Sequence, residues 1–556
     1  MPPTHEVLNQ PPPLAGYDLY DADPVLGDAL HREGGGWAEE RVRALGVLAG
    51  SPETIALGEA ADTHPPLLRT HDRHGRRIDE VEFHPAWHRL LGTAVSHGLH
   101  AAPWRDPRPG AQVARAAGFY LWTQVEAGHG CPVSMTFAAV PALRAAPELA
   151  AAWEPKLTAT TYQPGLAPVA AKAGALCGMA MTEKQGGSDV RASTTTAEPA
   201  RSDGLWLLTG HKWFCSAPMS DAFLVLAQTP ASALGPGPAG LSCFLVPRVL
   251  PDGTRNRFHL QRLKDKLGNR ANASAEVELD GAAGWPVGEP GRGLAAILEM
   301  VNHTRLDCVV GSAALMRQAV AQATHHAAHR SAFGRRLADQ PLMTNVLADL
   351  AVESEAATML AMRVAGSFDR AAGDPAEAAL RRLATAAAKY WVCKRAPAVA
   401  SEALECLGGN GYVEESGMPR LYREAPLNSI WEGAGNINSL DVLRVLARQP
   451  EALAALGDEL APARAAEPRL DRAAAAVERE LAAAGDPVGL QSGARRLVER
   501  LAVLLQAALL VRHGHPAVAD AFCASRVDGD RGAAFGTLPP GLDLTAIVER
   551  ATPKTG

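Results

Sequence analysis

The chain has 556 residues, which is too long for one hydrophobic core and predicts three or four domains. Apolar residues make up 47% and charged residues 21% of the chain, an ordinary globular composition that excludes wholesale disorder. The formal net charge of −6, from 54 basic and 60 acidic residues, excludes a global basic field for nucleic acid and leaves only a local patch open.

Cysteine spacing and apolar stretches indicate where the protein resides. The eight cysteines form no CxxC pair, a poor pattern for zinc or disulfides, so we expect a reduced, cytoplasmic setting. The first twenty residues lack the basic and then apolar pattern of a signal peptide. The most apolar stretch, Leu501 to Val511, is too short to span a bilayer, so we expect no membrane association.

In the first half of the chain, predicted helices are followed by predicted strands. Residues 1 to about 180 are predicted to be helical, and in the segment 111–128 the residues Val113, Ala116 and Tyr120 keep helical spacing on one face. From Gly204 to Asp280, short β-prone runs alternate with Gly, Pro and Asn turns. This spacing predicts a small antiparallel barrel or sandwich.

The second half returns to a helical period. Leu294, Ile297, Leu298 and Val301 fall at i, i+3, i+4 and i+7, and helices are predicted to continue to about Arg444, interrupted by a glycine-rich turn at 408–411. The segment ARQPEALAALG then reads as a linker. Beyond it, a second apolar stripe of helical spacing comprises Leu497, Leu501, Leu504, Leu505 and Ala508.

The densest polar cluster, MTEKQGGSDV (181–190), directly precedes the β-prone region. Two adjacent glycines allow close backbone approach to a ligand, and Thr182 and Ser188 offer hydroxyls, which suits a phosphate or a flavin edge. As an isolated string, such a sequence is more often an ordinary surface loop.

Two further strings carry candidate chemistry. GHKWFCSAP (210–218) sets Trp213 and Phe214 beside small polar residues, an arrangement that could clamp a planar cofactor or simply form a strand with core aromatics. IWEGAGNINSLDVLR (430–444) holds Glu432 beside Trp431, and an apolar neighbour raises the pKa of a carboxylate, which favours a general base. The alternative is a solvated surface glutamate.

Two other strings are misleading. GPGPAG (235–240) matches the GxGxxG dinucleotide pattern, but it contains two prolines and leads into a predicted strand, so we interpret it as a turn. THHAAHR (324–330) has no accompanying carboxylate or cysteine pattern, so we predict solvated helix histidines and no metal site.

Taken in order, six strings across 181–436 resemble the acyl-CoA dehydrogenase family of flavoproteins. They are MTEKQGGSD, KWFCS, LKDKLGNRANAS, HRSAFGRRLADQ, LECLGGNGYVEE and IWEGAGN. The narrower resemblance is to the AidB-like branch, the alkylation-response flavoproteins. It is carried by VLNQPPPL (7–14), DEVEFHPAWHRL (79–90), NHTRLDC (302–308), RLYREAPLNSIWEG (420–433) and a segment after about residue 445, so it covers nearly the whole chain.

The resemblance implies an α+β, mostly α fold in four domains: an N-terminal helical domain (1–180), a central antiparallel β-barrel (181–290), a C-terminal helical bundle (291–445) and a helical extension (446–556). It also implies non-covalent FAD and a homotetramer in which one subunit touches its neighbour's FAD. The acyl-CoA substrate would be oxidised between its α and β carbons and the electrons passed to an unidentified acceptor.

The resemblance also assigns roles to individual residues. Along the flavin's pyrimidine edge and ribityl chain it implies Met181, Thr182, Gly187 and Ser188, and over the isoalloxazine it implies Trp213, Phe214, Cys215 and Ser216. For the pyrophosphate and adenine end it implies Arg330, Phe333 and Gln340, with close backbone approach at Gly408 and Gly409. It also implies that Trp431, Gly433 and Asn436 are cofactor-binding residues. Glu432 matches the base that takes the α-proton while the β-hydride passes to flavin N5.

The chain departs from the family pattern at several of these positions. Cys215 stands where the family has Thr, so either Cys215 or Ser216 bonds flavin N5, and we favour Ser216. Other replacements are Lys184 for Pro, Glu405 for Gln, Ala434 for Thr and Asn436 for Gln. Trp431 is larger than the Tyr common in the family's dehydrogenases and would narrow the acyl cavity. The substrate that the family resemblance implies is a short acyl-CoA, branched ones included.

The resemblance to the AidB-like branch, rather than to the wider family, implies a second function. The protein would be a DNA-binding flavoprotein that protects DNA from alkylation, with secondary redox activity. Residues 451–556 hold 12 basic and 14 acidic residues, a balance of −2, so double-stranded DNA would need a local face such as Arg495, Arg496 and Arg500. These arginines also fit the solvated flank of the neighbouring leucine stripe. A third possibility is that the extension only mediates subunit packing.

Overall fold

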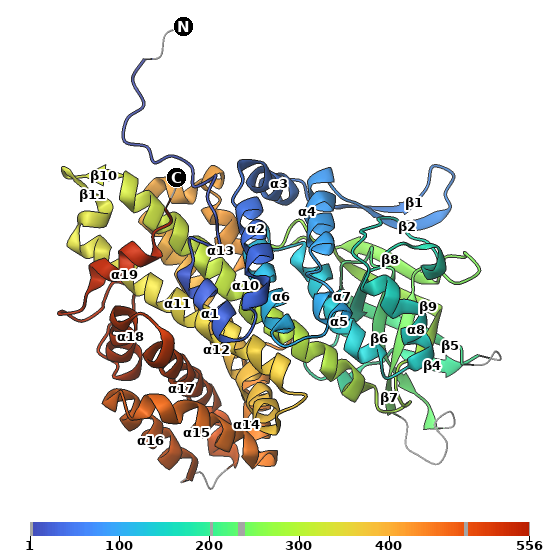
Figure 1. Ribbon diagram of the computed structural model, residues 1–556. Helices are drawn as coiled ribbons and strands as arrows, with labels where there is room; N and C mark the ends of the chain where they lie inside the picture. Colours follow the sequence, from blue (N-terminus) through green and yellow to red (C-terminus); the bar gives the residue numbers. More distant parts are fainter. Residues whose placement is uncertain (1–3, 201–203, 232–239, 483–486, 555–556) are drawn as a thin grey trace. The chain divides into compact units, whose positions relative to one another are not determined.

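The computed structural model describes residues 4–200, 204–231, 240–482 and 487–554, and the chain divides into two compact units (Figure 1). The helical unit comprises Met1–Ile55, Pro109–Val125 and Cys308–Gly556. The barrel unit comprises Ala56–Arg108 and Glu126–Asp307. The predicted α+β, mostly helical fold with a central β-domain is confirmed. The four domain boundaries stay a prediction.

The β-domain is a sheet that closes on itself. Its strands are β3 (Cys177–Ala180), β4 (Thr196–Pro199), β5 (Trp206–Ser216), β6 (Ala222–Thr229), β7 (Gly240–Pro247), β8 (Phe258–Leu263) and β9 (Ser274–Pro286). The strand order β6-β4-β5-β9-β7 is completed by a β6–β7 pairing, with β3 beside β6 and β8 beside β9. Most pairs are antiparallel, as predicted, but β3 and β4 each run parallel to β6. Closure removes most exposed strand edges.

Side chains that point into the barrel form its core. The alternation of β-strands sends every second residue inward, and the inward set includes Phe223, Phe244, Phe258 and Cys215, all at most 1% exposed. The remaining barrel-unit elements are β1 (Leu67–His71), β2 (Arg77–Glu82), α4 (Pro85–Ser96), α5 (Ala102–Arg105), α7 (Gly130–Leu143) and α8 (Pro147–Leu157). The β1–β2 hairpin lies in the region predicted to be helical, and Arg77 on β2 donates to the carbonyl of Leu260 on β8 at 2.8 Å.

The helical unit is built mainly from helices. They are α1 (Pro24–Arg32), α2 (Glu39–Ala49), α6 (Ala111–Thr123), α11 (Pro341–Arg370), α12 (Pro375–Cys406), α13 (Met418–Glu424), α14 (Gly435–Arg448), α15 (Pro450–Arg464), α16 (Pro468–Ala482), α17 (Pro487–His513), α18 (Pro516–Phe522) and α19 (Leu544–Ala551). The longest of those lying wholly within the unit are α11, α12 and α17. Two helices, α3 (Pro52–Thr63) and α10 (Gly293–His329), continue from one unit into the other. A two-stranded hairpin, β10 (Ser331–Ala332) with β11 (Arg335–Arg336), follows α10.

Two predictions about helix surfaces are corrected. The predicted helix at 111–128 is α6, but all of its residues are buried rather than one face, because α2 and α11 both pack on it. The histidines of THHAAHR are not all solvated, since His325 and His326 are buried and only His329 is exposed. Burial lowers the pKa of His326 to about 4. Within the described residues, no cluster of His, Cys, Asp and Glu could hold a metal ion.

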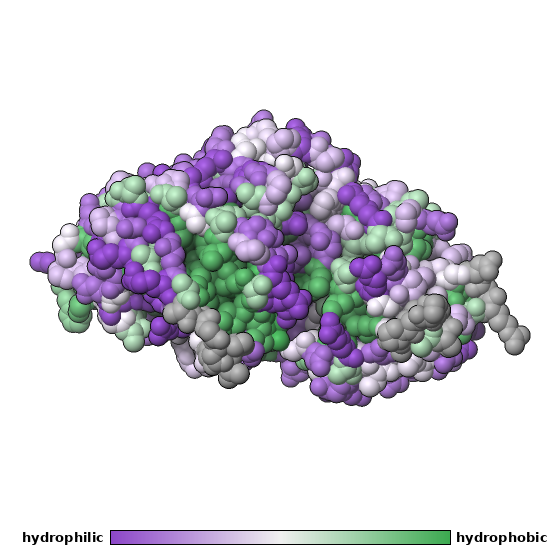
Figure 2. All heavy atoms as spheres, turned by 90° about the horizontal axis from the view of Figure 1, so that it is seen from below, coloured by the Kyte–Doolittle hydropathy of each residue, from purple (hydrophilic) through white to green (hydrophobic). Residues whose placement is uncertain are grey.

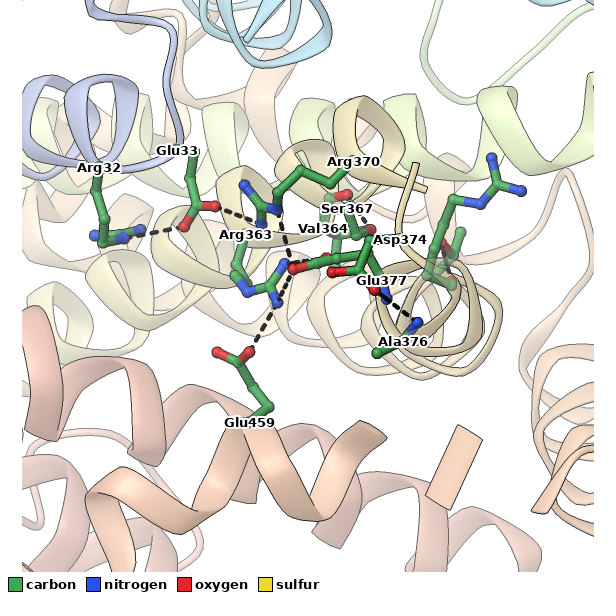
Figure 3. Close-up of polar contacts among 12 residues, drawn as sticks. Arg32, Glu33, Arg363, Val364, Ser367, Arg370, Asp374, Ala376, Glu377 and Glu459 are labelled. Atoms are coloured by element: carbon green, nitrogen blue, oxygen red, sulfur yellow. Dashed lines mark hydrogen bonds and ion pairs between the residues drawn. The ribbon is translucent and has the colours of Figure 1, made fainter. Parts of the chain in front are cut away.

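The segment after residue 445 packs on the helices before it through ion pairs that are largely, though not completely, buried. Figure 3 shows Arg363 of α11 between Glu377 of α12, at 3.0 Å, and Glu459 of α15, at 2.7 Å. Arg370 joins the same network and pairs with Glu33 at 2.9 Å. Buried pairs that lose one partner are costly. The extension is therefore tied to the bundle and not attached through a linker alone.

Surface properties complete the description. Figure 2 shows apolar residues reaching the surface of the helical unit on the face that carries α14 and α15, and Ile430, Leu440 and Leu453 are exposed in this part of the chain. Among the described helices, none combines the length and apolarity needed to cross a membrane. Of the string interpreted as a turn, residues 235–239 lie outside the described residues and Gly240 begins β7.

Candidate active site

The loop at 181–195 is anchored to the barrel by a buried ion pair. Lys212 of β5 lies 2.8 Å from a carboxylate oxygen of Glu183, and both side chains are fully buried. Glu183 also accepts hydrogen bonds from the backbone N–H groups of Thr194 and Thr195, at 2.7 and 3.1 Å. Burial acts to raise the pKa of Glu183, but the Lys212 ammonium and these donors outweigh it and hold the pKa well below its usual range.

Beyond the part that this ion pair anchors, the loop exposes polar groups to solvent. Met181 and Thr182 are half-buried, while Gly187 and Ser188 are exposed. A Cβ on Gly187 would come within 2.4 Å of the Thr182 hydroxyl oxygen, so only glycine fits there without a shift. The Thr182 carbonyl accepts the Trp213 backbone N–H at 2.8 Å. This bond joins the two strings that the sequence singled out.

A bulge in β5 turns two aromatic rings outward. Lys212 pairs with Val277 and Cys215 with Ala275, so three residue steps on β5 oppose two on β9. Trp213 and Phe214 therefore both lie off the barrel core, and Phe214 is 51% exposed. The Lys264 ammonium lies 3.1 Å from the centroid of the Trp213 ring, a cation–π contact.

The same bulge separates the two candidates for the flavin N5 contact. Cys215 is completely buried in the barrel core, and burial raises the pKa of its thiol to about 12. Ser216 is half-buried, and its hydroxyl lies 3.2 Å from that of Ser274. A thiol in the core cannot reach a ligand on the barrel surface, so Ser216 stays the candidate.

In the helical unit, the predicted pyrophosphate and adenine residues surround the β10–β11 hairpin. Phe333 occupies the hairpin tip with φ +53° and is 98% exposed. Gln340 donates to the Ala332 carbonyl at 2.9 Å. Arg330 donates to the carbonyl of Asn9 at 2.6 Å, and the Asn9 side chain bonds the backbone of Ser331.

The N-terminal segment links this hairpin to the glycine turn after α12. Gln10 accepts a hydrogen bond from Asn410 at 3.0 Å, one residue after Asn9 reaches the hairpin. Gly408 and Gly409 are exposed, and no atom would meet a Cβ built on either one within 4 Å. The two sets of residues that the family places at one end of the cofactor thus lie near the same short segment.

The candidate base lies on the loop before α14. Glu432 is half-buried and adopts φ +57°, which is uncommon outside glycine. The Trp431 indole donates to Asn428 at 2.9 Å, and Gly433 follows with φ +102°. Asn436 is exposed, and its side-chain oxygen accepts from Arg495 of α17 at 2.8 Å. The extension therefore touches the first turn of α14, which directly follows this loop.

The structure thus brings the predicted residues together in sets, each within one unit. In the barrel unit, residues 181–188 lie with residues 213–216. In the helical unit, residues 330–340 lie with residues 408–409, and residues 431–436 form a separate set. Sequence reasoning missed two lysines. Lys212 stands inside a quoted motif but was assigned no role. Lys389 lies in an alanine-rich helix, and its only signal is a charge in a run of buried apolar residues.

Three family models match successive parts of the chain. Residues 9–164 match the adaptive response protein AidB N-terminal domain, residues 178–282 the acyl-CoA dehydrogenase middle domain, and residues 291–447 the acyl-CoA dehydrogenase C-terminal domain. Over 527 residues the chain is 46% identical to AidB of Escherichia coli (strain K12), which covers 94% of this chain and 95% of that protein.

Solved structures are similar over most of the chain. Caenorhabditis elegans ACDH-11 in complex with C11-CoA matches with a TM-score of 0.84 at 29% identity and covers 94% of each chain. An acyl-CoA dehydrogenase from Bacillus anthracis complexed with FAD matches with a TM-score of 0.62 at 22% identity, over 80% of this chain and 78% of that chain. This second likeness is one of fold alone.

Proposed function

The chain belongs to the acyl-CoA dehydrogenase family, in its AidB branch, and on that premise we propose that it is an FAD-dependent acyl-CoA dehydrogenase acting on a short acyl-CoA, straight or branched. The proposal rests on Glu432, which the sequence motif matches to the family's general base. Its loop holds it in an unusual backbone conformation. The C11-CoA complex of the C. elegans relative supports an acyl-CoA as the class of substrate.

The residues present fit FAD. In the barrel unit, Trp213 offers an aromatic face, the Gly187 position has no room for a side chain, and Thr182, Ser188 and Ser216 supply hydroxyls. In the helical unit, the space beside Gly408 and Gly409 is open and Phe333 is almost fully exposed. Planar cofactors are bound by such combinations of aromatic surface and sparse hydrogen-bonding groups.

In the proposed reaction the Glu432 carboxylate takes the proton from the α-carbon of the thioester, and a double bond forms between the α and β carbons. FAD, when bound, supplies the acceptor for the hydride that leaves the β-carbon. The α-proton is only weakly acidic, so a hydrogen-bond donor must polarise the thioester carbonyl at the same time. Trp431, fixed through Asn428, would limit the length of the acyl chain.

The test is anaerobic mixing of the yellow protein with straight and branched acyl-CoA thioesters while the oxidised flavin absorbance is followed. We expect bleaching by short members and a loss of rate of about 10²-fold or more in Glu432→Gln, since general-base catalysis contributes that much. Glu549→Gln, the same change at an exposed residue of α19, is the matched control and should bleach at the wild-type rate. Unchanged bleaching in Glu432→Gln would contradict the assignment.

We also propose that the protein assembles as a homotetramer. Large apolar side chains near the β10–β11 hairpin are strongly exposed: Phe333 at 98%, Leu342 at 86% and Tyr412 at 82%. Exposed apolar groups of this size are typical of surfaces that another chain covers. Light scattering should give four times the chain mass, and Phe333→Asp should lower it.

Protection of DNA is the alternative function, and the arginines proposed for it have partners within the chain. Arg495 donates to Asn436, Arg500 lies close to Glu480, and Arg496 is 3.6 Å from the same carboxylate. This pairing reduces the charge available to phosphates. Duplex binding that weakens steeply with salt and is lost in Arg496→Ala would favour the alternative.

A further inference from the structure

A buried lysine contacts the backbone on both sides of Glu432. Lys389 lies in α12 and is 1% exposed. Its Nζ donates to the carbonyl of Trp431 at 2.7 Å and to the carbonyl of Gly433 at 2.5 Å. The two acceptors are the residues immediately before and after Glu432. Hydrogen bonds from an ammonium group are shorter and stronger than those between neutral groups.

The backbone between these two carbonyls is in a conformation that glutamate disfavours. Glu432 has φ +57°, in the left-handed region, where a Cβ crowds the following carbonyl oxygen and reduces the population by roughly tenfold or more. Such residues persist only where the surroundings determine their conformation. The Trp431 carbonyl belongs to the peptide plane directly before Glu432, and the Gly433 carbonyl belongs to the plane that follows Gly433. The two bonds from Lys389 therefore hold both ends of the short segment that contains Glu432 and restrain its conformation.

Neighbouring groups complete the restraint. The Asn438 side chain, completely buried on α14, also donates to the Gly433 carbonyl, at 2.5 Å. On the other side, the indole of Trp431 donates to Asn428, which in turn donates to Ser312 of α10 at 3.2 Å. The loop is thus held from α12, α14 and α10, and Lys389 is the one donor that bridges both flanks of Glu432 in these contacts.

We propose that Lys389 is a positioning residue that holds Glu432 in its left-handed conformation and so presents the carboxylate to the substrate in one orientation. The catalytic part of this inference rests on the proposed function of Glu432. The structural part does not, because the restraint on the loop exists without substrate.

The experiment compares variants of the full-length holoprotein. Lys389→Met removes the ammonium group with both of its hydrogen bonds and keeps an unbranched side chain of similar length. Asn438→Ala removes only the second donor to Gly433 and is the milder variant if Lys389→Met fails to fold. Lys172→Met is the control for general loss of a buried lysine, because Lys172 also donates to two carbonyls, those of Gln163 and Gly165, both at 2.6 Å, but in the barrel unit. Since Lys172 also pairs with Asp221 at 3.0 Å, this control disturbs the fold at least as much as Lys389→Met.

The first readout is hydrogen–deuterium exchange of the peptide covering 427–438. Lys389→Met should speed its exchange by about tenfold or more, since two buried hydrogen bonds are lost. Asn438→Ala should speed it less, and Lys172→Met should leave it unchanged. If the peptide exchanges at the same rate in Lys389→Met as in the control Lys172→Met, the proposal is overturned.

The second readout separates positioning from general stability. Flavin bleaching by the best acyl-CoA should slow about 10²-fold in Lys389→Met, because small misplacements of a reacting group cost that much, while the Kd of the acyl-CoA stays within a few fold. Equal loss of both quantities, or the same slowing in Lys172→Met, would refute a positioning role. If no acyl-CoA bleaches the wild-type flavin, the proposed function fails and the exchange result still decides whether Lys389 restrains the loop.

Discussion

Replacing Lys212 by Met should destabilise the barrel unit and reverse the pH dependence of its stability. The Glu183 carboxylate is fully buried and would lose its only ion-pair partner among the described contacts, 2.8 Å away. The donors from Thr194 and Thr195 would remain. An unpaired carboxylate in a buried site is strongly disfavoured, so the variant isolates the contribution of the lysine.

The magnitude follows from the burial of both partners. Removing one member of a buried pair costs about 3–5 kcal/mol of the free energy of unfolding. In the wild type, the pKa of Glu183 is held below the 4.5 of the unfolded chain, so its stabilising contribution is present above pH 4.5 and is lost as the pH falls below it. In Lys212→Met, burial acts without the ammonium and raises that pKa above 4.5. Stability should then increase as the pH falls from 7 towards 5.

Urea denaturation at pH 5, 6 and 7, followed by tryptophan fluorescence, measures both effects. The double variant Lys212→Met/Glu183→Gln should recover at least half of the loss at pH 7, because no charge remains to be buried. Arg257→Met removes one partner of an exposed pair, Arg257 with Asp280 at 3.9 Å, and should change the free energy of unfolding by about 0.5 kcal/mol or less. The reasoning is refuted if Lys212→Met costs less than about 1 kcal/mol at pH 7 or becomes less stable as the pH falls to 5.

Three further predictions follow from the geometry of single residues. Ser216→Ala should shift the flavin absorbance spectrum while Cys215→Ala should leave it unchanged, since only the serine lies outside the barrel core; the opposite pattern would identify the cysteine as the contact. Gly187→Ala should weaken FAD binding at least tenfold by titration of the apoprotein, because the new methyl group meets the Thr182 hydroxyl at 2.4 Å, and an unchanged affinity would contradict this reasoning. Burial raises the pKa of Glu355 to about 7, so the protonated Glu355 stabilises the folded state at low pH, and this stabilisation is lost as the pH rises from 4.5 through 7. The melting temperature of Glu355→Gln should therefore depend less on pH in that range than the melting temperature of the wild type. An equal pH dependence of the two melting temperatures would contradict the raised pKa.

Much of the fold could be predicted from local patterns. The apolar period after Gly293 is the start of α10, and the leucine stripe from Leu497 to Ala508 is buried in α17. The run of short strands between turns is the barrel. These predictions succeed because periodicity reports which side of a single element faces the core. The two motif strings at 181–190 and 210–218 were singled out separately from the sequence, and the structure joins them through the bond from the Trp213 N–H to the Thr182 carbonyl.

The features that only the tertiary structure determined are contacts between segments far apart in the chain. The closing of the sheet by β6 and β7, the parallel pairing of β3 with β6 and the complete burial of α6 depend on which elements pack together. Local spacing is compatible with several such arrangements. The same holds for the lysines: Lys389 precedes Glu432 by 43 positions, and Lys212 follows Glu183 by 29. A sequence identifies the group that can act as a base, whereas the buried charges that hold its loop become visible only when the packed helices and strands bring them within hydrogen-bond distance.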